Sequence, residues 1–266
     1  MSQTDSYTRL TPIRIVLVEP AGPLNVGSVA RVMKNMGLEQ LVLVNPRCDP
    51  LGDEAKRMAV HAGDILERAI TVSCLPEALT GCQRAIATTA RSRSQGLPTD
   101  LEAPRTVLPW LLYCPSALIF GPEDRGLNND ELSYAQRFLS IPSSSVYPSL
   151  NLAQSVGVCC YELRYCVLET QGGTEDKMVT PNLSTVPLEV LEGYYQQLEA
   201  MLLRIGYVYP HTANSRMKKF RRLFNRANLT SEEVAMLRGI LSQVEWALNC
   251  NNSVAIDDTL KLSPDL

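Results

Sequence analysis

The sequence predicts an α/β protein with a mainly parallel sheet and helices on both faces, followed by a small all-α C-terminal domain. Short apolar, β-branched runs that end in turn residues recur before residue 143, as buried parallel strands do. Stretches of helical periodicity lie between these runs. Beyond residue 187 the periodicity is helical and strand signals are absent.

The first elements set the pattern. "RIVLVEP" at 14–20 is a short apolar run ended by proline, which predicts a buried strand. "NVGSVARVMKNMG" follows, and we expect a helix with Asn25 as N-cap and Gly37 as C-cap. The same signals predict further strands at 40–46, 71–74, 84–90, 116–122 and 137–143, and helices near 53–61, 76–81, 103–113, 129–136 and 149–169.

The helix at 149–169 has an unusual start. Apolar residues recur along it every three to four positions, as in a helix that faces a core. Ser149 is the expected N-cap, which leaves Asn151 in the first turn, where no cap is needed. This second polar group suggests that the segment holds something besides its own backbone. The apolar positions are Leu152, Val156, Cys159, Leu163 and Val167.

We expect a catalytic domain at 1–169, a linker at 170–186 and a helical extension at 187–266. The stretch "TQGGTEDKMVTPNLSTVP" is polar and rich in Gly, Pro and Thr, as linkers are. In the extension, Thr230 and Glu233 form a capping-box pattern at the start of a helix. Phe220 and Phe224, spaced i, i+4, are expected to pack a helix onto the core.

Composition limits the possible classes of function. Hydrophobic residues make up 45% and charged residues 20% of the chain, values typical of globular proteins. The apolar runs are too short for a membrane span, and the N-terminus lacks the pattern of a signal peptide. The eight Cys contain no C-x-x-C pair, so we expect small core residues in a reducing cytoplasm. The chain has only two His, which makes a His-based metal site or a serine-hydrolase triad improbable.

Charge is distributed unevenly. The net charge is −3, yet the row from Ala200 to Ser231 contains seven Lys or Arg and no Asp or Glu. Such a patch can bind a polyanion or can simply be a solvated helix face. The pattern alone leaves both readings open.

Four segments that follow predicted strands are rich in Gly, Pro, Ser, Asn and Arg. In parallel sheets, ligands bind beyond the carboxyl ends of the strands, so four such segments predict a shared pocket. Each also has a plain structural explanation: Asn25 as a cap, Arg31 as a solvated side chain, Thr88 and Thr89 as ordinary strand residues, Gly121 and Gly126 as turn residues with positive φ. The segments are 19–31, 88–91, 121–127 and 142–151.

Two common nucleotide-binding signatures are missing. No G-x-G-x-x-G follows the first strand, and no G-x-x-x-x-G-K-[ST] occurs. This disfavours a dinucleotide oxidoreductase and a P-loop ATPase.

Three motifs occur in a familiar order. "E-P-x-x-x-x-N-x-G-x-x-A-R" at 19–31, "G-P-E-x-x-G-L" at 121–127, and "I-P" followed by "L-N" within 141–151 resemble the signature motifs of the SpoU/TrmH family. These proteins are RNA 2′-O-ribose methyltransferases of the SPOUT superfamily. The tail "MKKFRRLFNRANLTSEEVAMLRGILSQVEWAL" is similar to the C-terminal extension of TrmJ-type tRNA methyltransferases, which modify cytidine or uridine at nucleotide 32, the first of the anticodon loop.

The resemblance implies a trefoil knot in the C-terminal part of the sheet, although knots are very rare. It implies a homodimer with active sites built from both chains, and S-adenosyl-L-methionine as methyl donor without a metal. Many members have Met and Gly inside the third motif, where this chain has "PSSSVYPSL". This departure concerns the loop near the substrate.

The resemblance also implies site residues. Arg31, Asn25, Ser149 and Asn151 are the catalytic candidates, and Glu123 is expected to order the loops by pairing with a nearby Arg. The donor pocket is expected to contain Thr88, Thr89, Ala90, Gly121, Ile141, Pro148, Ser149 and Leu150. The tRNA is expected to contact Arg31 and the basic run, namely Arg216, Lys218, Lys219, Arg221, Arg222 and Arg226.

Other functions compete with this interpretation. The same chemistry on ribosomal RNA is the nearest alternative, and the tail argues against it. A catalytically silent RNA-binding protein would be expected to lack Arg31, Asn25 or Asn151, and all three are present. A flavodoxin-like protein would bind flavin and have no affinity for RNA.

Overall fold

The computed structural model describes residues 10–90, 101–112, 114–172 and 185–260. The chain divides into two compact units. Unit 1 consists of Met1–Asn182 and Pro187–Glu189, and unit 2 of Leu183–Val186 and Val190–Leu266. Most of the expected linker, 173–184, lies outside the described residues, so the linker and the domain bounds stay predictions.

Unit 1 is built on a seven-stranded sheet in the order β3-β2-β1-β6-β4-β7-β5. Every strand pair is parallel, which confirms the predicted fold class. The strands are β1 (Ile13–Val18), β2 (Gln40–Val44), β3 (Ile70–Val72), β4 (Arg84–Thr88), β5 (Leu101–Glu102), β6 (Ser116–Phe120) and β7 (Arg137–Leu139).

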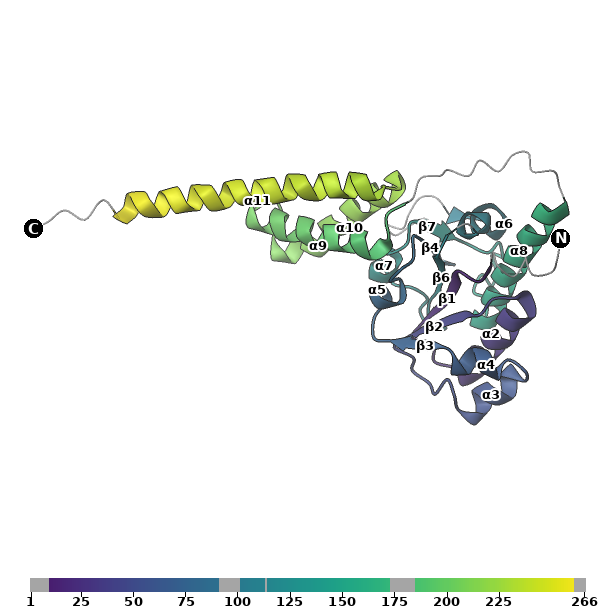
Figure 1. Cartoon of the computed structure of the whole chain (residues 1–266). Coiled ribbons are helices and arrows are strands. Elements are labelled where there is room, and N and C mark those ends of the chain that lie inside the picture. The colour runs from purple at the N-terminus through teal and green to yellow at the C-terminus, as the bar shows by residue number, and fades with distance from the viewer. Residues whose placement is uncertain (1–9, 91–100, 113, 173–184, 261–266) are drawn as a thin grey trace, which may run out of the picture. The chain divides into compact units, whose positions relative to one another are not determined.

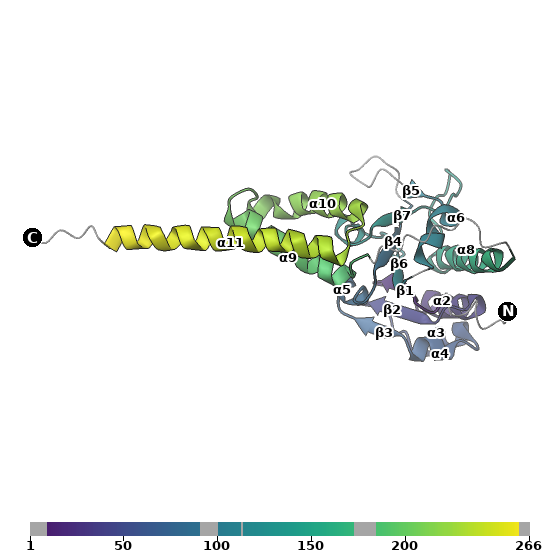
Figure 2. The same cartoon turned by 45° about the horizontal axis from the view of Figure 1, so that its top comes forward.

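Helices cover both faces of this sheet (Figures 1 and 2). One face carries α2 (Pro23–Met36), α3 (Asp53–Ala59), α4 (Gly63–Glu67), α6 (Pro104–Val107), the 3₁₀ turn η1 (Leu108–Leu111) and α8 (Leu152–Gly172); the other carries α5 (Leu75–Ala78) and α7 (Asn129–Leu132).

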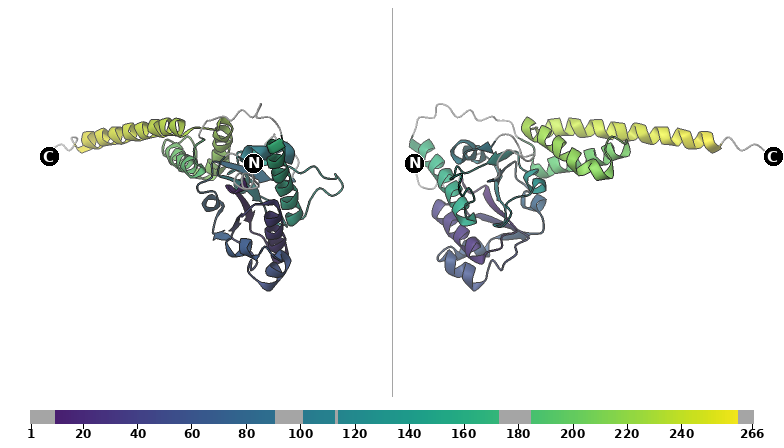
Figure 3. Two further views of the ribbon diagram at one scale, coloured as in Figure 1. Left: turned by 45° about the vertical axis from the view of Figure 1, so that its right-hand side comes forward. Right: turned by 180° about the vertical axis from the view of Figure 1, so that it is seen from behind.

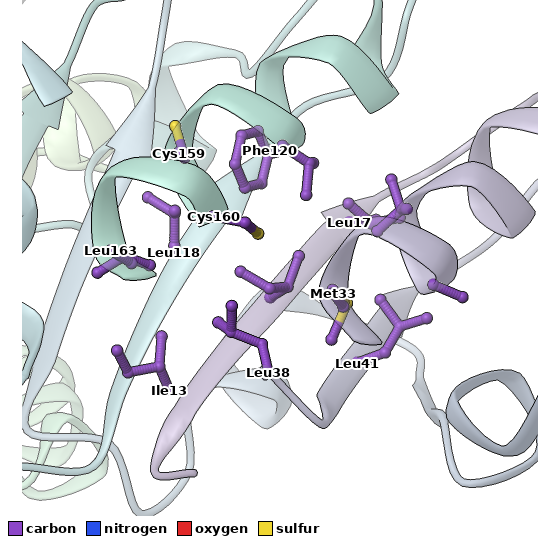
Figure 4. Close-up of a cluster of buried hydrophobic side chains, with 14 of the residues drawn as sticks. Ile13, Leu17, Met33, Leu38, Leu41, Leu118, Phe120, Cys159, Cys160 and Leu163 are labelled. Carbon is purple, nitrogen blue, oxygen red and sulfur yellow. The ribbon is translucent and has the colours of Figure 1, made fainter. Parts of the chain in front are cut away.

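The central strands are buried on both faces because their side chains alternate between two cores. In β1, Ile15 and Leu17 point into the core under α2 and α8, whereas Val16 and Val18 point into the core under α5 and α7. Figure 4 shows part of the first core, where Phe120 and Cys160 lie between the sheet and α8. The predicted inward positions of α8 are confirmed as buried: Leu152, Val156, Cys159, Leu163 and Val167.

Helix α2 lies close to α3 because Gly27 has no side chain. A Cβ atom there would lie 2.2 Å from the carbonyl oxygen of Ala55, too close for any other residue. The helix ends at Gly37, whose φ of 80° confirms the predicted C-cap. Among the cysteines, Cys82, Cys159 and Cys160 are core residues as predicted, but Cys74 is exposed.

Some local predictions were wrong. The helix expected at 103–113 is divided into α6 and η1, because Pro109 has no N–H to continue an α-helix. Strand β5 and helix α4 were not predicted. They span two and five residues, too few to show a period.

Unit 2 is helical and consists of α9 (Leu188–Arg204), α10 (Pro210–Ala227) and α11 (Ser231–Leu260); α9 begins on the segment assigned to unit 1. Tyr194, Tyr195 and Met217 form its core, and Phe220 and Phe224 pack against it as predicted. Helix α11 continues past the ends of α9 and α10 (Figure 3). The predicted capping box is confirmed, since the Glu233 N–H donates to the Thr230 hydroxyl and the Thr230 N–H to the Glu233 carboxylate.

Within the described residues, none of the helices combines the length and the apolar character that crossing a bilayer requires. The trefoil knot stays a prediction.

Candidate active site

A pocket of about 310 Å³ lies at the carboxyl ends of β4, β6 and β7. These three strands are neighbours in the sheet, so the loops that follow them meet at one edge. The pocket contains all of the residues predicted to bind the donor, namely Thr88, Thr89, Ala90, Gly121, Ile141, Pro148, Ser149 and Leu150.

Backbone and hydroxyl hydrogen bonds fix the walls of the pocket. The Thr88 hydroxyl donates to the carbonyl of Ile119 at 3.0 Å, and the Thr89 N–H donates to the carbonyl of Leu139 at 2.9 Å. At Gly121 a Cβ atom would lie 2.3 Å from the Leu127 nitrogen, so glycine is required there by a close approach. Gly126 has a positive φ, 65°, as the plain turn interpretation of this segment requires, whereas Gly121 does not.

A chain of three polar side chains lies beside this pocket and joins all three motifs. Asn25 Nδ2 donates to Glu123 Oε1 at 2.8 Å, and Asn151 Nδ2 donates to Asn25 Oδ1 at 2.9 Å. The remaining Asn151 Oδ1 accepts the N–H groups of Ala153 and Gln154 at 2.9 and 3.3 Å. One hydrogen-bonded series therefore runs from Glu123 to the first turn of α8.

The order of donors and acceptors in this series is determined by its ends. An ionised carboxylate can only accept, so the Asn25 amide must turn its Nδ2 towards Glu123 and its Oδ1 towards Asn151. Asn151 must then turn its Oδ1 towards the helix, where free N–H groups need an acceptor. The carboxylate of Glu123 thereby fixes the orientation of both amides.

These contacts correct two capping predictions. Helix α2 begins at Pro23 with Gly22 as N-cap, so Asn25 lies inside the first turn and not at the cap. In α8 the cap is Asn151, whose carbonyl also accepts the Ser155 N–H, whereas Ser149 lies in the preceding loop and lines the pocket. Asn151 thus performs both roles that the sequence divided between two residues.

Among the residues that the structure describes, Glu123 forms no ion pair with an arginine, contrary to our expectation. Its carboxylate accepts the N–H groups of Ala21 and Gly22 at 3.1 and 3.2 Å as well as the Asn25 amide. Burial opposes ionisation of this carboxyl, but the Asn25 and backbone hydrogen bonds outweigh it, and the pKa of Glu123 lies below its usual value. Glu123 therefore fastens the first motif to the second.

Ion pairs around the same loops were not predicted. Arg125 bonds to Glu19 at the end of β1 and to Glu131 at the start of α7. Arg47 forms a bidentate salt bridge with Asp124, in which Nη1 donates to Oδ2 at 3.0 Å and Nη2 donates to Oδ1 at 3.1 Å. Arg47 and Asp124 are 77 positions apart in the chain, so no local pattern could have paired them.

Arg31 is set apart from the other catalytic candidates. Its side chain is exposed on α2, and Arg31 does not line the pocket of its own chain. Of the four strand-end segments expected to form the pocket, the last three line it. The first reaches it through the contacts of Asn25 and the 21–22 backbone with Glu123, and through the ion pair of Glu19 with Arg125.

The predicted RNA-binding cations lie on α10. Arg216, Lys219, Arg222 and Arg226 are exposed and Lys218 is partly exposed. Arg221 differs from them, because it bonds to Glu192 at 2.5 and 2.6 Å and lies over the ring of Tyr195 at 4.5 Å. Its guanidinium is occupied inside unit 2.

No group of three His, Cys, Asp or Glu side chains in the described part of the chain is arranged to hold a metal ion.

Comparison with known families gives two matches that together cover most of the chain. Residues 12–161 match the SpoU rRNA Methylase family. Residues 189–253 match the C-terminal domain of the tRNA methyltransferase TrmJ.

Individual relatives match along nearly their whole length. A tRNA (cytidine/uridine-2′-O-)-methyltransferase TrmJ from Pectobacterium atrosepticum is 42% identical over 89% of this chain and 98% of its own. A tRNA (cytidine/uridine/adenosine-2′-O-)-methyltransferase TrmJ from Pseudomonas aeruginosa is 42% identical over 89% of this chain and 95% of its own. The crystal structure of TrmJ from Z. mobilis superposes with a TM-score of 0.75 at 30% identity, covering 87% of this chain and 98% of that one.

Proposed function

The chain belongs to the SpoU methylase family and has a TrmJ-type C-terminal domain, and from this premise we propose that it methylates the ribose 2′-hydroxyl of tRNA. The proposed donor is S-adenosylmethionine and the proposed target is nucleotide 32, a cytidine or uridine. The observation that carries the proposal is that all the expected donor-binding residues line one and the same pocket. The names of the relatives support the substrate and the reaction.

The pocket suits the donor in size and lining. Its volume of about 310 Å³ is at the lower end of the range for small-molecule sites. Gly121 leaves the 121–127 backbone open to close contact, and Ile141 and Leu150 provide apolar walls. When bound, S-adenosylmethionine supplies a methyl group that its sulfonium centre makes electrophilic. The chain's part is to hold the donor and the acceptor ribose in line for attack.

Arg31 is the proposed contact to the ribose and its adjacent phosphate. Because a guanidinium stays protonated, Arg31 is a poor base, but it can fix a phosphate and stabilise the negative charge that develops on the 2′-oxygen. Its exposed position away from its own pocket supports a site completed by Arg31 of a second copy. We therefore propose a homodimer.

Exposed apolar residues on α8 support this dimer. Val158, Tyr161 and Leu168 are 37%, 51% and 47% exposed and are spaced as one face of a helix. The opposite face of α8 packs into the core of unit 1. A second copy that covers this face would bury apolar surface that is otherwise exposed to water.

The tRNA backbone is the proposed partner of α10. Four exposed cations and Lys218 project from this helix, a charge density that attracts phosphates. Because Arg221 bonds to Glu192, the proposal assigns it a structural role instead of an RNA contact.

The direct test is methyl transfer from labelled S-adenosylmethionine to total tRNA and to ribosomal RNA in parallel, followed by nuclease mapping of the labelled nucleotide. We expect label at a 2′-O-methylated ribose at nucleotide 32. Label confined to ribosomal RNA would mean that the proposed reaction is right but that its substrate is ribosomal RNA and not tRNA. Donor binding without label in either RNA would overturn the proposal.

A further inference from the structure

The loop between β7 and α8 carries two highly exposed apolar side chains. Val146 is 91% and Tyr147 is 78% exposed, the highest values of any large apolar side chain in the part of the chain that the structure describes. Apolar surface of this kind, when it lies beside a pocket, indicates a contact with a ligand or partner.

This exposure follows from the fold of the loop. The Ser143 hydroxyl donates to the carbonyl of Pro148 at 2.9 Å, and the Val146 N–H donates to the Ser144 hydroxyl at 3.2 Å. Pro148 also restricts the backbone of Tyr147 to extended conformations. Hydrogen bonds within the loop thus define its conformation, and in this conformation the Tyr147 ring is exposed to solvent.

The position of Tyr147 relates it to the acceptor nucleotide. Pro148, Ser149 and Leu150, which follow directly, line the donor pocket. For methyl transfer, the acceptor ribose must lie at the mouth of that pocket, with its oxygen within about 3.5 Å of the methyl carbon. The base attached to that ribose must then lie close to the loop that carries these three residues, and the exposed Tyr147 directly precedes them.

We propose that Tyr147 stacks on the base of the nucleotide whose ribose is methylated. This inference rests on the proposed function and extends it to a residue that positions the substrate. An exposed aromatic face is the usual platform for an unpaired base. Stacking uses the face that every base has and makes no hydrogen bond that identifies the base. Tyr147 therefore positions cytidine and uridine equally.

A second copy of the chain could instead cover Tyr147. RNA is the better candidate because Tyr147 directly precedes three residues that line the pocket, and the target base must lie beside that pocket for the reaction to occur. The exposed apolar face of α8, by contrast, lies on a different element, and none of Val158, Tyr161 and Leu168 lines this pocket.

The test compares three variants of the full chain: Tyr147→Ala, Tyr147→Phe and Val146→Ala. Val146→Ala is the matched control, since it removes a neighbouring apolar side chain that has no stacking face. The measured quantities are kcat and KM with tRNA transcripts carrying cytidine or uridine at the target position, donor affinity, and mass in solution. A transcript with a fluorescent cytidine analogue, pyrrolocytidine, at that position reports stacking without turnover.

We expect Tyr147→Ala to raise KM for both transcripts by about tenfold, as loss of one stacked base does, with donor affinity unchanged. Tyr147→Phe should behave as the wild type, and Val146→Ala should change KM less than Tyr147→Ala does. Binding of the wild type should quench the analogue, and Tyr147→Ala should abolish the quenching.

Three outcomes would overturn the inference: an unchanged KM in Tyr147→Ala, an equal loss in Tyr147→Phe, or a fall in mass that shows a contact between copies. Failure of the proposed function is distinguishable, because it appears as absence of tRNA methylation by the wild type in the same assay.

Discussion

The loops around the donor pocket and the basic surface of α10 use their polar residues in opposite ways. In the loops, Glu123, Asn25 and Asn151 bond to one another and to the backbone, so their geometry is set before any ligand arrives. On α10, Arg216, Lys219 and other cations are exposed. The first arrangement suits a reaction that needs exact positions, and the second suits attraction of a polyanion over a distance.

Each region contains one arginine that departs from its surroundings. Arg31 belongs to the motifs of the pocket, yet it is exposed and does not line it. Arg221 belongs to the basic run, yet it is bonded to Glu192 and packed on Tyr195. Membership of a motif or a charged run therefore does not by itself indicate what a side chain contacts.

Replacement of Arg31 should have the largest effect. We expect Arg31→Ala to lower kcat by about 100-fold or more, as loss of one group that stabilises developing charge does, while donor affinity stays unchanged. Lys34→Ala is the control on the same helix, because the Lys34 ammonium donates to the His61 carbonyl and to the Asp64 carboxylate, neither of which lines the pocket. If donor affinity falls in parallel with kcat, Arg31 belongs to the donor pocket and the assignment is wrong.

A mixture of variants tests whether Arg31 acts across the dimer. Arg31→Ala and Asn151→Asp should each be inactive alone. If Arg31 serves the pocket of its partner, a mixed dimer contains one site with both residues intact, and mixing should restore activity. Failure to restore activity, when exchange of subunits is verified by mass, would mean that each chain builds its own site.

Removal of the exposed cations should affect tRNA binding next most strongly. In the variant with Arg216, Lys219, Arg222 and Arg226 changed to Ala, we expect KM for tRNA to rise about tenfold or more at physiological salt. The slope of log affinity against log salt should fall by about 3, because four phosphate contacts are lost. Donor affinity and kcat at saturating tRNA should persist. If the slope is unchanged, the cations of α10 do not contact RNA and form only a solvated helix face.

Arg221 and Arg216 provide a matched pair within α10. Arg221→Ala breaks charge-assisted bonds to Glu192, and we expect it to destabilise the chain by about 2 kcal/mol. Arg216→Ala removes an exposed side chain and should cost under about 0.5 kcal/mol, but it should weaken tRNA binding more. Denaturant titration and a filter-binding assay measure the two effects. Equal effects on stability would contradict the structural role of Arg221.

The parts of the site that the sequence predicted are those determined locally or by motif. The strand-end rule placed Thr88, Gly121 and Ser149 correctly at one pocket, because parallel strands end at a common edge. The apolar residues of α8 recur every three to four positions, and this spacing correctly predicted which face of the helix is buried. Both features depend on periods and end positions that a single sequence shows directly.

Two of the wrong predictions at the site concern partners that lie far apart in the chain. Asn25 was expected as a cap because Asn favours that position. Instead its side-chain amide donates to Glu123, which is 98 positions away in the chain. Glu123 was expected to pair with an arginine, whereas backbone N–H groups satisfy it. Since propensity describes only near neighbours, it cannot say which of two available acceptors a side chain will face.

Asn151 offers a finer test, because one side chain caps a helix and orients Asn25. Asn151→Ala should lose both functions and destabilise the chain by about 1 kcal/mol. Asn151→Asp keeps acceptors for the Ala153 and Gln154 N–H groups but cannot donate to Asn25 Oδ1. We expect this variant to retain stability and lose activity, as measured by thermal unfolding and methyl transfer. Equal stability losses in the two variants would show that the cap does not depend on the carboxyl or amide oxygen.

The smallest effect concerns the pH dependence that Glu123 confers on the loops. Because the pKa of Glu123 is lowered in the folded chain, its ionised form is preferred there. The resulting stabilisation is complete above the usual glutamate pKa of about 4.3 and is lost as pH falls through the lowered pKa. Glu123→Gln removes this contribution, so its melting temperature should lie below that of the wild type at neutral pH and approach it in acid. The exposed Glu67→Gln should differ little from the wild type at neutral pH. The difference in melting temperature between the wild type and Glu123→Gln should therefore shrink in acid. If it stays constant from neutral pH into acid, the shape of the Glu123 side chain, and not its charge, joins the first motif to the second.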